Sequence, residues 1–141
     1  MSDARRVSEV LIRAFNSHDL DAMARCYSDS AVYVSPSGTA EGPMEIASYY
    51  GLFLEGFPDL RLTPMKTLVF GDEAFTQWML SGTQTGHFLM PGGRTIEASG
   101  RCVTIRGCSL RTVENGLIQT NCIYYDQAEL FSQLGAHLAM D

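Results

Sequence analysis

The first part of the chain carries its apolar residues at helical spacing. Apolar side chains recur every three or four positions from residue 7 to residue 15, so they form one stripe along a helix that Ser2 or Asp3 can cap. The polar residues 16–19 interrupt this helix. A second short helix follows, and the residues on its inward face are Leu20, Met23, Ala24 and Tyr27.

A β-favouring run and a third helix come next. Residues 31–34 favour a short strand, which the turn-forming residues 35–38 close. Gly42 and Pro43 begin the third helix, because proline is tolerated in a first helical turn, and the helix ends at Gly56. Its predicted buried face consists of Ile46, Tyr49, Tyr50, Phe53 and Leu54.

From residue 61 onward, β-rich segments replace the helical spacing. Strands are predicted at 61–70, at 74–83, in two pieces within 95–113, and at 117–125, with turns at 71–73 and 114–116. Asp126, with Glu129 three residues later, predicts the start of a last helix that stops at Gly135. Helices followed by antiparallel strands and a closing helix are typical of an α+β fold, and we expect one domain over residues 1–141.

Composition narrows the classes of function. The chain has 141 residues, of which 45% are hydrophobic and 18% charged, so one sizeable core is expected. Its net charge is −6 and its basic residues are scattered, which argues against a nucleic-acid partner. The sequence has neither an apolar run of the ~20 residues that span a bilayer nor the pattern of a secretory signal, so we expect a cytoplasmic protein without a membrane partner.

The four cysteines do not have the spacing of a metal or dithiol site. They lack paired C-x-x-C spacing and have no His-rich partner nearby, so we expect reduced, packed thiols and no bound metal.

Several short phrases along the chain carry a family resemblance. They are Ala14-Phe15-Asn16, Gly42-Pro43, Phe57-Pro58-Asp59-Leu60, Gly82-Thr83-Gln84-Thr85-Gly86, Tyr124-Tyr125-Asp126-Gln127 and Gln133-Leu134-Gly135. Together they resemble the SnoaL-like polyketide cyclases and ester cyclases of the nuclear transport factor 2-like superfamily, over nearly the whole chain. The resemblance implies a cone-shaped barrel, in which three N-terminal helices pack on a curved antiparallel β-sheet with a short C-terminal helix. It also implies a pocket for a small apolar or aromatic ligand.

The reaction that the resemblance implies is an intramolecular aldol closure of a polycyclic or polyketide-like substrate, without a cofactor. One acid/base group can remove and donate the protons of such a reaction. In this chain, the family's aspartate position is Ile123 and its histidine position is Asn121. The resemblance therefore supports a ligand pocket in this chain more directly than it supports the aldol reaction.

Aromatic residues are the predicted substrate contacts. The family's ligand-facing helix positions fall at Phe15 and Tyr49, and packing in the core is the alternative for each aromatic residue. The full set of predicted substrate-binding residues is Phe15, Tyr33, Tyr49, Phe53, Trp78, Asn121, Ile123 and Tyr125.

His87 and Asp126 are the candidates to replace the missing acid. His87 follows a turn, and imidazole titrates near neutral pH, although a surface-loop histidine is the alternative. Asp126 is nearest in sequence to the family's position. Strand alternation points it away from the face shared by Asn121, Ile123 and Tyr125, and helix capping already explains it.

Two classes of function therefore stay open. One is a cofactor-free enzyme, either a cyclase, an isomerase or a hydratase, and the other is a non-catalytic ligand-binding or dimeric assembly module. An epoxide hydrolase is less expected, because Arg106 and Arg111 have no aspartate beside them on the predicted strands. The segment 74–80 is apolar on both faces, which predicts a homodimer through the outer face of the sheet.

Overall fold

The computed structural model describes residues 3–89 and 93–136. The helices are α1 (Asp3–Asn16), α2 (Leu20–Ala24), α3 (Gly42–Gly56) and α4 (Gln127–Gln133). The strands are β1 (Tyr27–Ser35), β2 (Gly38–Glu41), β3 (Arg61–Phe70), β4 (Glu73–Thr83), β5 (Phe88–Leu89), β6 (Thr95–Ile96), β7 (Cys102–Glu114) and β8 (Leu117–Tyr125).

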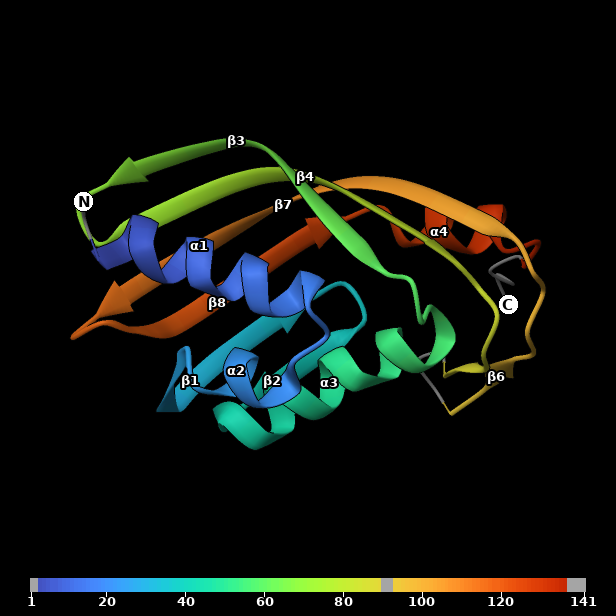
Figure 1. The fold of residues 1–141 in the computed structure, drawn as a ribbon, viewed down its shortest axis with the longest axis horizontal. Helices are drawn as coiled ribbons and strands as arrows, with labels where there is room; N and C mark the ends of the chain where they lie inside the picture. The colour runs from blue at the N-terminus through green and yellow to red at the C-terminus, as the bar shows by residue number, and fades with distance from the viewer. Residues whose placement is uncertain (1–2, 90–92, 137–141) are drawn as a thin grey trace.

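Six of the strands form one curved sheet, in the order β2-β1-β8-β7-β4-β3. The predicted α+β class is confirmed: the long strands arch over α1, and α3 lies beside β1 and β2 (Figure 1). The prediction of a wholly antiparallel sheet is wrong at one place, because β1 and β8 pair in parallel. Their pairing joins segments that are far apart in sequence, and local alternation carries no information about such a pairing.

The predicted element boundaries are most accurate where glycine and proline mark them. The limits of α3, β3 and β8 are those expected, and Gly135 ends the last turn with a φ of +78°. Tyr27, predicted on the second helix, instead begins β1, where it pairs with Ile118. The short strands β2 and β5 were not predicted, because two to four residues are too few to show alternation.

The core consists of two apolar clusters. One lies between the N-terminal helices and β1, and the other surrounds Trp78 and Phe88 and includes α4. Phe15 and Ile123 pack against both clusters, so they mark the region between the two.

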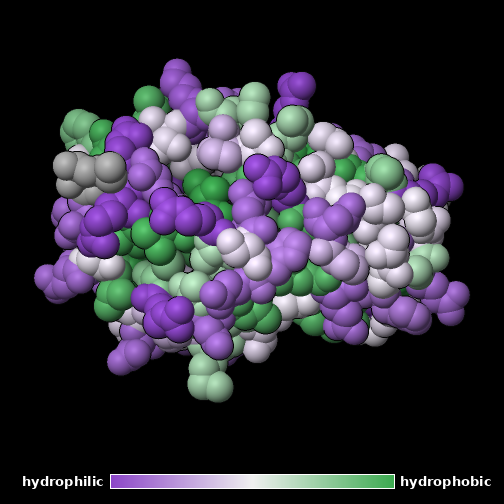
Figure 2. All heavy atoms as spheres, viewed as in Figure 1, coloured by the Kyte–Doolittle hydropathy of each residue, from purple (hydrophilic) through white to green (hydrophobic). Residues whose placement is uncertain are grey.

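The surface combines polar residues with apolar patches. In Figure 2, hydrophobic residues are visible in patches between hydrophilic ones on the face that Figure 1 views. The cysteines are all free, and Cys26 is buried as expected, whereas Cys102 is exposed. No helix in the described ranges is long and apolar enough to cross a membrane.

Candidate functional site

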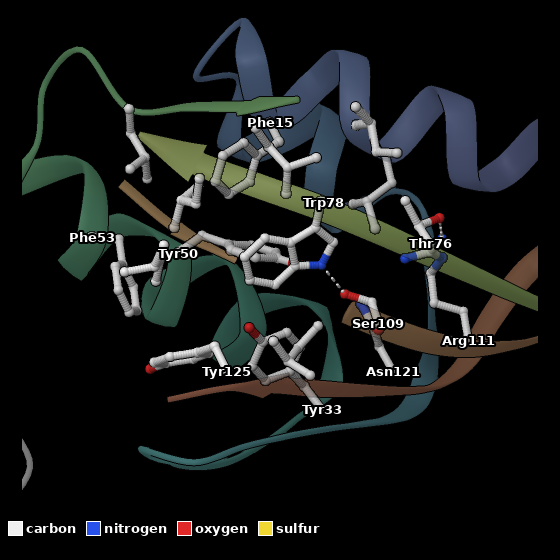
Figure 3. Close-up of a pocket in the computed structure, with 17 residues that line it drawn as sticks. Phe15, Tyr33, Tyr50, Phe53, Thr76, Trp78, Ser109, Arg111, Asn121 and Tyr125 are labelled. Carbon is white, nitrogen blue, oxygen red and sulfur yellow. Dashed lines mark hydrogen bonds between the residues drawn. The ribbon is translucent and has the colours of Figure 1, made fainter. Parts of the chain in front are cut away.

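A cavity lies between the helices and the inner face of the sheet. Its wall is built from α1, α3 and the inward residues of β1, β3, β4, β7 and β8, together with Leu60 (Figure 3). About 70 Å³ of this cavity is open to the centre of a water molecule, which is room for several waters or part of a small ligand. Among the described residues, the 17 that line it include one charged residue, Arg111, and no Asp, Glu or His.

Four polar residues from three neighbouring strands form one end of this cavity. Strand pairing places Thr76 opposite Ser109, and Arg111 opposite Asn121. All four are buried, with exposed fractions of 0% for Thr76, 4% for Ser109, 2% for Arg111 and 1% for Asn121. Phe53 and Tyr125, on the other side of the cavity in Figure 3, are only partly buried. The polar end is therefore the deep end.

Arg111 is held there by neutral groups. Its Nε donates to Ser8 Oγ at 3.0 Å, and a terminal guanidinium nitrogen donates to Thr76 Oγ1. No ion pair involves Arg111 within the described part of the chain. Burial lowers the pKa of the guanidinium, while the nearby Tyr27 and Tyr50 hydroxyls oppose this shift. An arginine nevertheless keeps its proton at neutral pH, so the deep end of the cavity carries a positive charge.

A chain of polar side chains continues from Arg111 through Asn121. Asn121 Nδ2 donates to the Tyr27 hydroxyl at 2.9 Å, and the Tyr27 and Tyr50 hydroxyls share a hydrogen bond of 2.8 Å. Asn121 Oδ1 is buried and has no hydrogen-bond partner among the described residues. Burial raises the pKa of Tyr27 to about 12 and that of Tyr50 well above its usual value, so both hydroxyls stay protonated at neutral pH.

The rest of the wall is aromatic. Tyr50 packs edge-on against Phe15 and Tyr33, with ring centroids 5.8 Å and 5.6 Å away. Trp78 is buried, and its Nε1 donates to Ser109 Oγ at 2.8 Å, which fixes the plane of the indole. Fixed aromatic faces of this kind favour a flat, conjugated ligand.

A second cavity of about 100 Å³, measured in the same way, lies between α3, β5 and α4. It shares Phe53 and Tyr125 with the first cavity, which is called the main cavity below because it lies between the helices and the inner face of the sheet and has 17 described lining residues against ten. Tyr49, predicted to face the ligand in the main cavity, lines this second one, and its hydroxyl bonds Ser35 Oγ at 2.8 Å. Its neighbour Tyr50 lines the main cavity instead, because one residue along a helix turns the side chain by ~100°.

The comparisons with known proteins place this architecture in a family. The profile of the SnoaL-like domain matches residues 9–121. The chain belongs to the SnoaL-like domain family. No curated protein matches the sequence.

Solved structures share the SnoaL-like fold along almost their whole length. IdmH of Streptomyces antibioticus, a proposed polyketide cyclase, is 22% identical with a TM-score of 0.79, covering 94% of this chain and 99% of its own. A protein of Jannaschia Sp. CCS1, a proposed SnoaL-like polyketide cyclase, is 21% identical with a TM-score of 0.78, covering 100% of this chain and 97% of its own. TerC, co-crystallised with polyporic acid, is 13% identical with a TM-score of 0.77, covering 96% and 100%.

The main cavity brings together most of the predicted substrate-binding residues. Seven of them line it: Phe15, Tyr33, Phe53, Trp78, Asn121, Ile123 and Tyr125. The positions that resemble the family's aspartate and histidine, Ile123 and Asn121, thus both face the interior.

The two catalytic candidates do not line this cavity. Asp126 is exposed and caps α4, where its carboxylate accepts from the backbone amides of Ala128 at 2.9 Å and Glu129 at 3.3 Å. His87 is exposed in the segment between β4 and β5. Their catalytic role stays a prediction, and the geometry offers neither a direct route to a ligand in the main cavity.

The sequence predicts one residue of the polar end, Asn121, and misses the other three. Arg111 enters the predictions only as part of an epoxide-opening cluster, and Thr76 and Ser109 are not among the predicted contacts. The available signal was alternation, because Arg111 shares its face of β7 with the buried residues Ser109 and Val113. No group of His, Cys, Asp or Glu that could hold a metal ion occurs within residues 3–89 and 93–136.

Proposed function

We propose that this SnoaL-like domain binds a planar, polyketide-like small molecule in the main cavity and promotes its ring closure without a cofactor, as a cyclase or a related lyase. The observation that carries the proposal is the combination of an aromatic wall with a buried group of hydrogen-bond donors at one end. Such donors stabilise negative charge that develops on a substrate oxygen.

The chemistry assigned to the chain's own residues is charge stabilisation. In an aldol closure, an enolate carbon attacks a carbonyl carbon, a C–C bond forms, and the carbonyl oxygen becomes an alkoxide. Arg111, Asn121 and Tyr50 line the cavity, and the Tyr50 hydroxyl is linked through Tyr27 to Asn121 at the buried end where such an oxygen would lie. Water would remove the proton from a carbon already acidified by two flanking carbonyls, and the hydronium ion so formed would protonate the alkoxide.

The second candidate is a ligand-binding module without catalysis. One observation favours it: among the described lining residues there is no carboxylate or imidazole that could move a proton at neutral pH. In both cases the ligand is a small molecule. TerC, which shares the fold, was crystallised with polyporic acid, and this supports small-molecule binding in this chain.

Trp78 provides the binding test. It is the single tryptophan of the chain and it lines the cavity, so a bound conjugated ligand should quench its fluorescence. Native mass spectrometry of the purified protein would identify a co-purified molecule. Saturable quenching is expected with planar aromatic ligands, and its absence across a panel of such ligands would refute the proposal.

Turnover separates the two candidates. A linear aromatic 1,3-diketone that closes with loss of water should cyclise faster with the protein than with buffer. Binding without acceleration would favour the ligand-binding module.

We also propose that the chain forms a homodimer through the outer face of its sheet. Strand pairing aligns one row of apolar residues across five strands of this face: Leu68, Phe75, Leu110, Cys122 and Val34. Leu68 and Leu110 are 53% and 38% exposed. Leu110→Glu should convert the dimer to a monomer in light scattering, whereas Gln77→Glu, on the same face, should not. A wild-type monomer would refute the proposal.

A further inference from the structure

The deep end of the cavity holds a buried cation that forms no ion pair with any residue that the structure describes. Arg111 is 2% exposed, and the partners of its guanidinium are the neutral hydroxyls of Ser8 and Thr76. Burying an unpaired charge is unfavourable, and proteins usually offset the cost with a carboxylate. The ion pair between Arg6 and Asp3, by contrast, joins two exposed side chains.

An unsatisfied acceptor lies beside this cation. Asn121 is 1% exposed and lines the cavity, and its Oδ1 has no partner among the described residues. Buried polar atoms are nearly always hydrogen-bonded, so an orphaned one at a cavity wall calls for a ligand or a water. Its amide nitrogen is already engaged by the Tyr27 hydroxyl at 2.9 Å, which fixes the oxygen as the free end.

The two groups lie side by side. Arg111 and Asn121 are directly paired across β7 and β8 and point to the same face of the sheet. Side chains paired in this way are ~5 Å apart at their Cβ atoms. One ligand end can therefore reach a donor with full positive charge and an acceptor at the same time.

We propose that this end of the cavity recognises the anionic oxygen of a carboxylate or enolate, with a hydroxyl beside it that donates to Asn121. The inference rests on the proposed function, because it assumes that the main cavity is the ligand site. The conjugated body of the ligand would then lie along Trp78 and Tyr50, toward Phe53 and Tyr125 (Figure 3). The substrate class is thus an acidic planar molecule.

A purely structural role is the competing explanation for Arg111. Its bonds to Ser8 and Thr76 tie α1 to β4, and such a tie would not depend on any ligand. The two explanations differ in what they predict for ligand charge, because a structural tie makes no distinction between an acid and its ester.

The experiment measures binding of matched two-ring probes by isothermal titration calorimetry. The probes are naphthoate, its neutral methyl ester, and a hydroxynaphthoate with the hydroxyl next to the carboxylate. The wild-type protein should bind naphthoate at least about tenfold more tightly than the ester, since charge-assisted hydrogen bonds are about twice as strong as neutral ones. The hydroxynaphthoate should bind more tightly still.

Variants assign the preference to the two residues. Arg111→Met should remove the preference for the acid and leave the affinity for the ester within about threefold. Asn121→Leu should remove the advantage of the added hydroxyl. Arg106→Gln is the matched control, because Arg106 lies on the same strand, is exposed, and should leave the preference unchanged.

The outcomes separate this inference from the function on which it rests. Equal binding of acid and ester by the wild type would overturn the anion site while leaving a ligand cavity in place. If none of the probes binds, both the anion site and the proposed function are overturned. The comparison of acid and ester needs only the wild-type protein, so it decides the question even if Arg111→Met does not fold.

Discussion

Gly107 is where a single added methyl group should do most damage to the cavity wall. The residue lies in β7 opposite Trp78, and a Cβ built on it would be 2.4 Å from Trp78 Cη2 and 2.6 Å from the backbone oxygen of Tyr124. Nonbonded carbon atoms pack at roughly 3.5–4.0 Å, so the overlap exceeds about 1 Å. The Tyr124 oxygen belongs to the sheet and cannot move away without loss of strand pairing. The indole must therefore shift.

The size of the effect follows from these contacts. Overpacking of a core typically costs about 1–3 kcal/mol, and a displaced indole also loses its hydrogen bond to Ser109, worth about 1 kcal/mol. Gly107→Ala should therefore lower the free energy of unfolding by about 3 kcal/mol, a large part of the roughly 5–15 kcal/mol of a typical domain. The measurement is urea denaturation followed by the fluorescence of Trp78.

Gly51→Ala is the matched control. A Cβ at Gly51 would meet Leu20 Cδ1 at 3.6 Å, an ordinary contact, and the residue lies inside α3. Alanine should raise the free energy of unfolding there by about 0.5–1 kcal/mol, because glycine is disfavoured in a helix. If Gly107→Ala unfolds within about 0.5 kcal/mol of the wild type, the placement of Trp78 against β7 is wrong.

Three further substitutions test other contacts. In Gly86→Ala, the new Cβ would lie 2.0 Å from the backbone oxygen of Glu55, so we expect a loss of about 2–4 kcal/mol in denaturation, and an unchanged stability would contradict this packing. The amide of Thr83 donates a hydrogen bond to the Asp59 carboxylate at 2.7 Å and lowers the pKa of that carboxyl. This hydrogen bond therefore stabilises the fold fully at pH values above the ordinary Asp pKa of about 3.9, and the stabilisation is lost as the pH falls through the lowered pKa. The difference in stability between wild type and Asp59→Asn should therefore shrink between about pH 5 and pH 2, and a constant difference would exclude this cause. Arg111→Met should change the free energy of unfolding by less than about 1 kcal/mol, because the Ser8 and Thr76 hydroxyls that bond the guanidinium each keep another hydrogen-bond partner. Removal of one member of a buried ion pair, by contrast, costs about 3–5 kcal/mol.

The sequence predicts the fold well where the signal is local. The proline after Gly42 and the glycine at position 56 bound α3 because each acts on its own backbone, and the strands before and after the 114–116 turn follow from alternation. The parallel pairing of β1 with β8 depends on contacts between residues about ninety positions apart, such as Tyr33 with Asn121, and no local pattern encodes it.

The candidate site could be predicted only in part. Ile123 and Tyr125 are correctly predicted on the wall, because the resemblance marks position 123 as ligand-facing and alternation puts residue 125 on the same face of the strand. The choice between Tyr49 and Tyr50 requires the rotation of α3 against the sheet, to within a fraction of a helical turn. Arg111 was overlooked because a charged residue on a strand ordinarily faces solvent, so its burial depends on tertiary packing.

The burial of Arg111 is also what separates a site from a packed interior. An apolar residue at this position would fill the same space without the free-energy cost of removing a guanidinium from water. Ser8 and Thr76 do not require the cation, because the Ser8 hydroxyl donates to the Ala4 carbonyl at 2.7 Å and the Thr76 hydroxyl bonds that of Thr67 at 3.3 Å. A costly group that its neighbours do not need is best explained by a partner outside the chain. Asn121 Oδ1, which lies across the strand pair and has no hydrogen-bond partner among the described residues, also indicates a partner outside the chain. Both costs would be offset by one ligand, and they are incurred at the deep end of the cavity where a ligand is most completely removed from water.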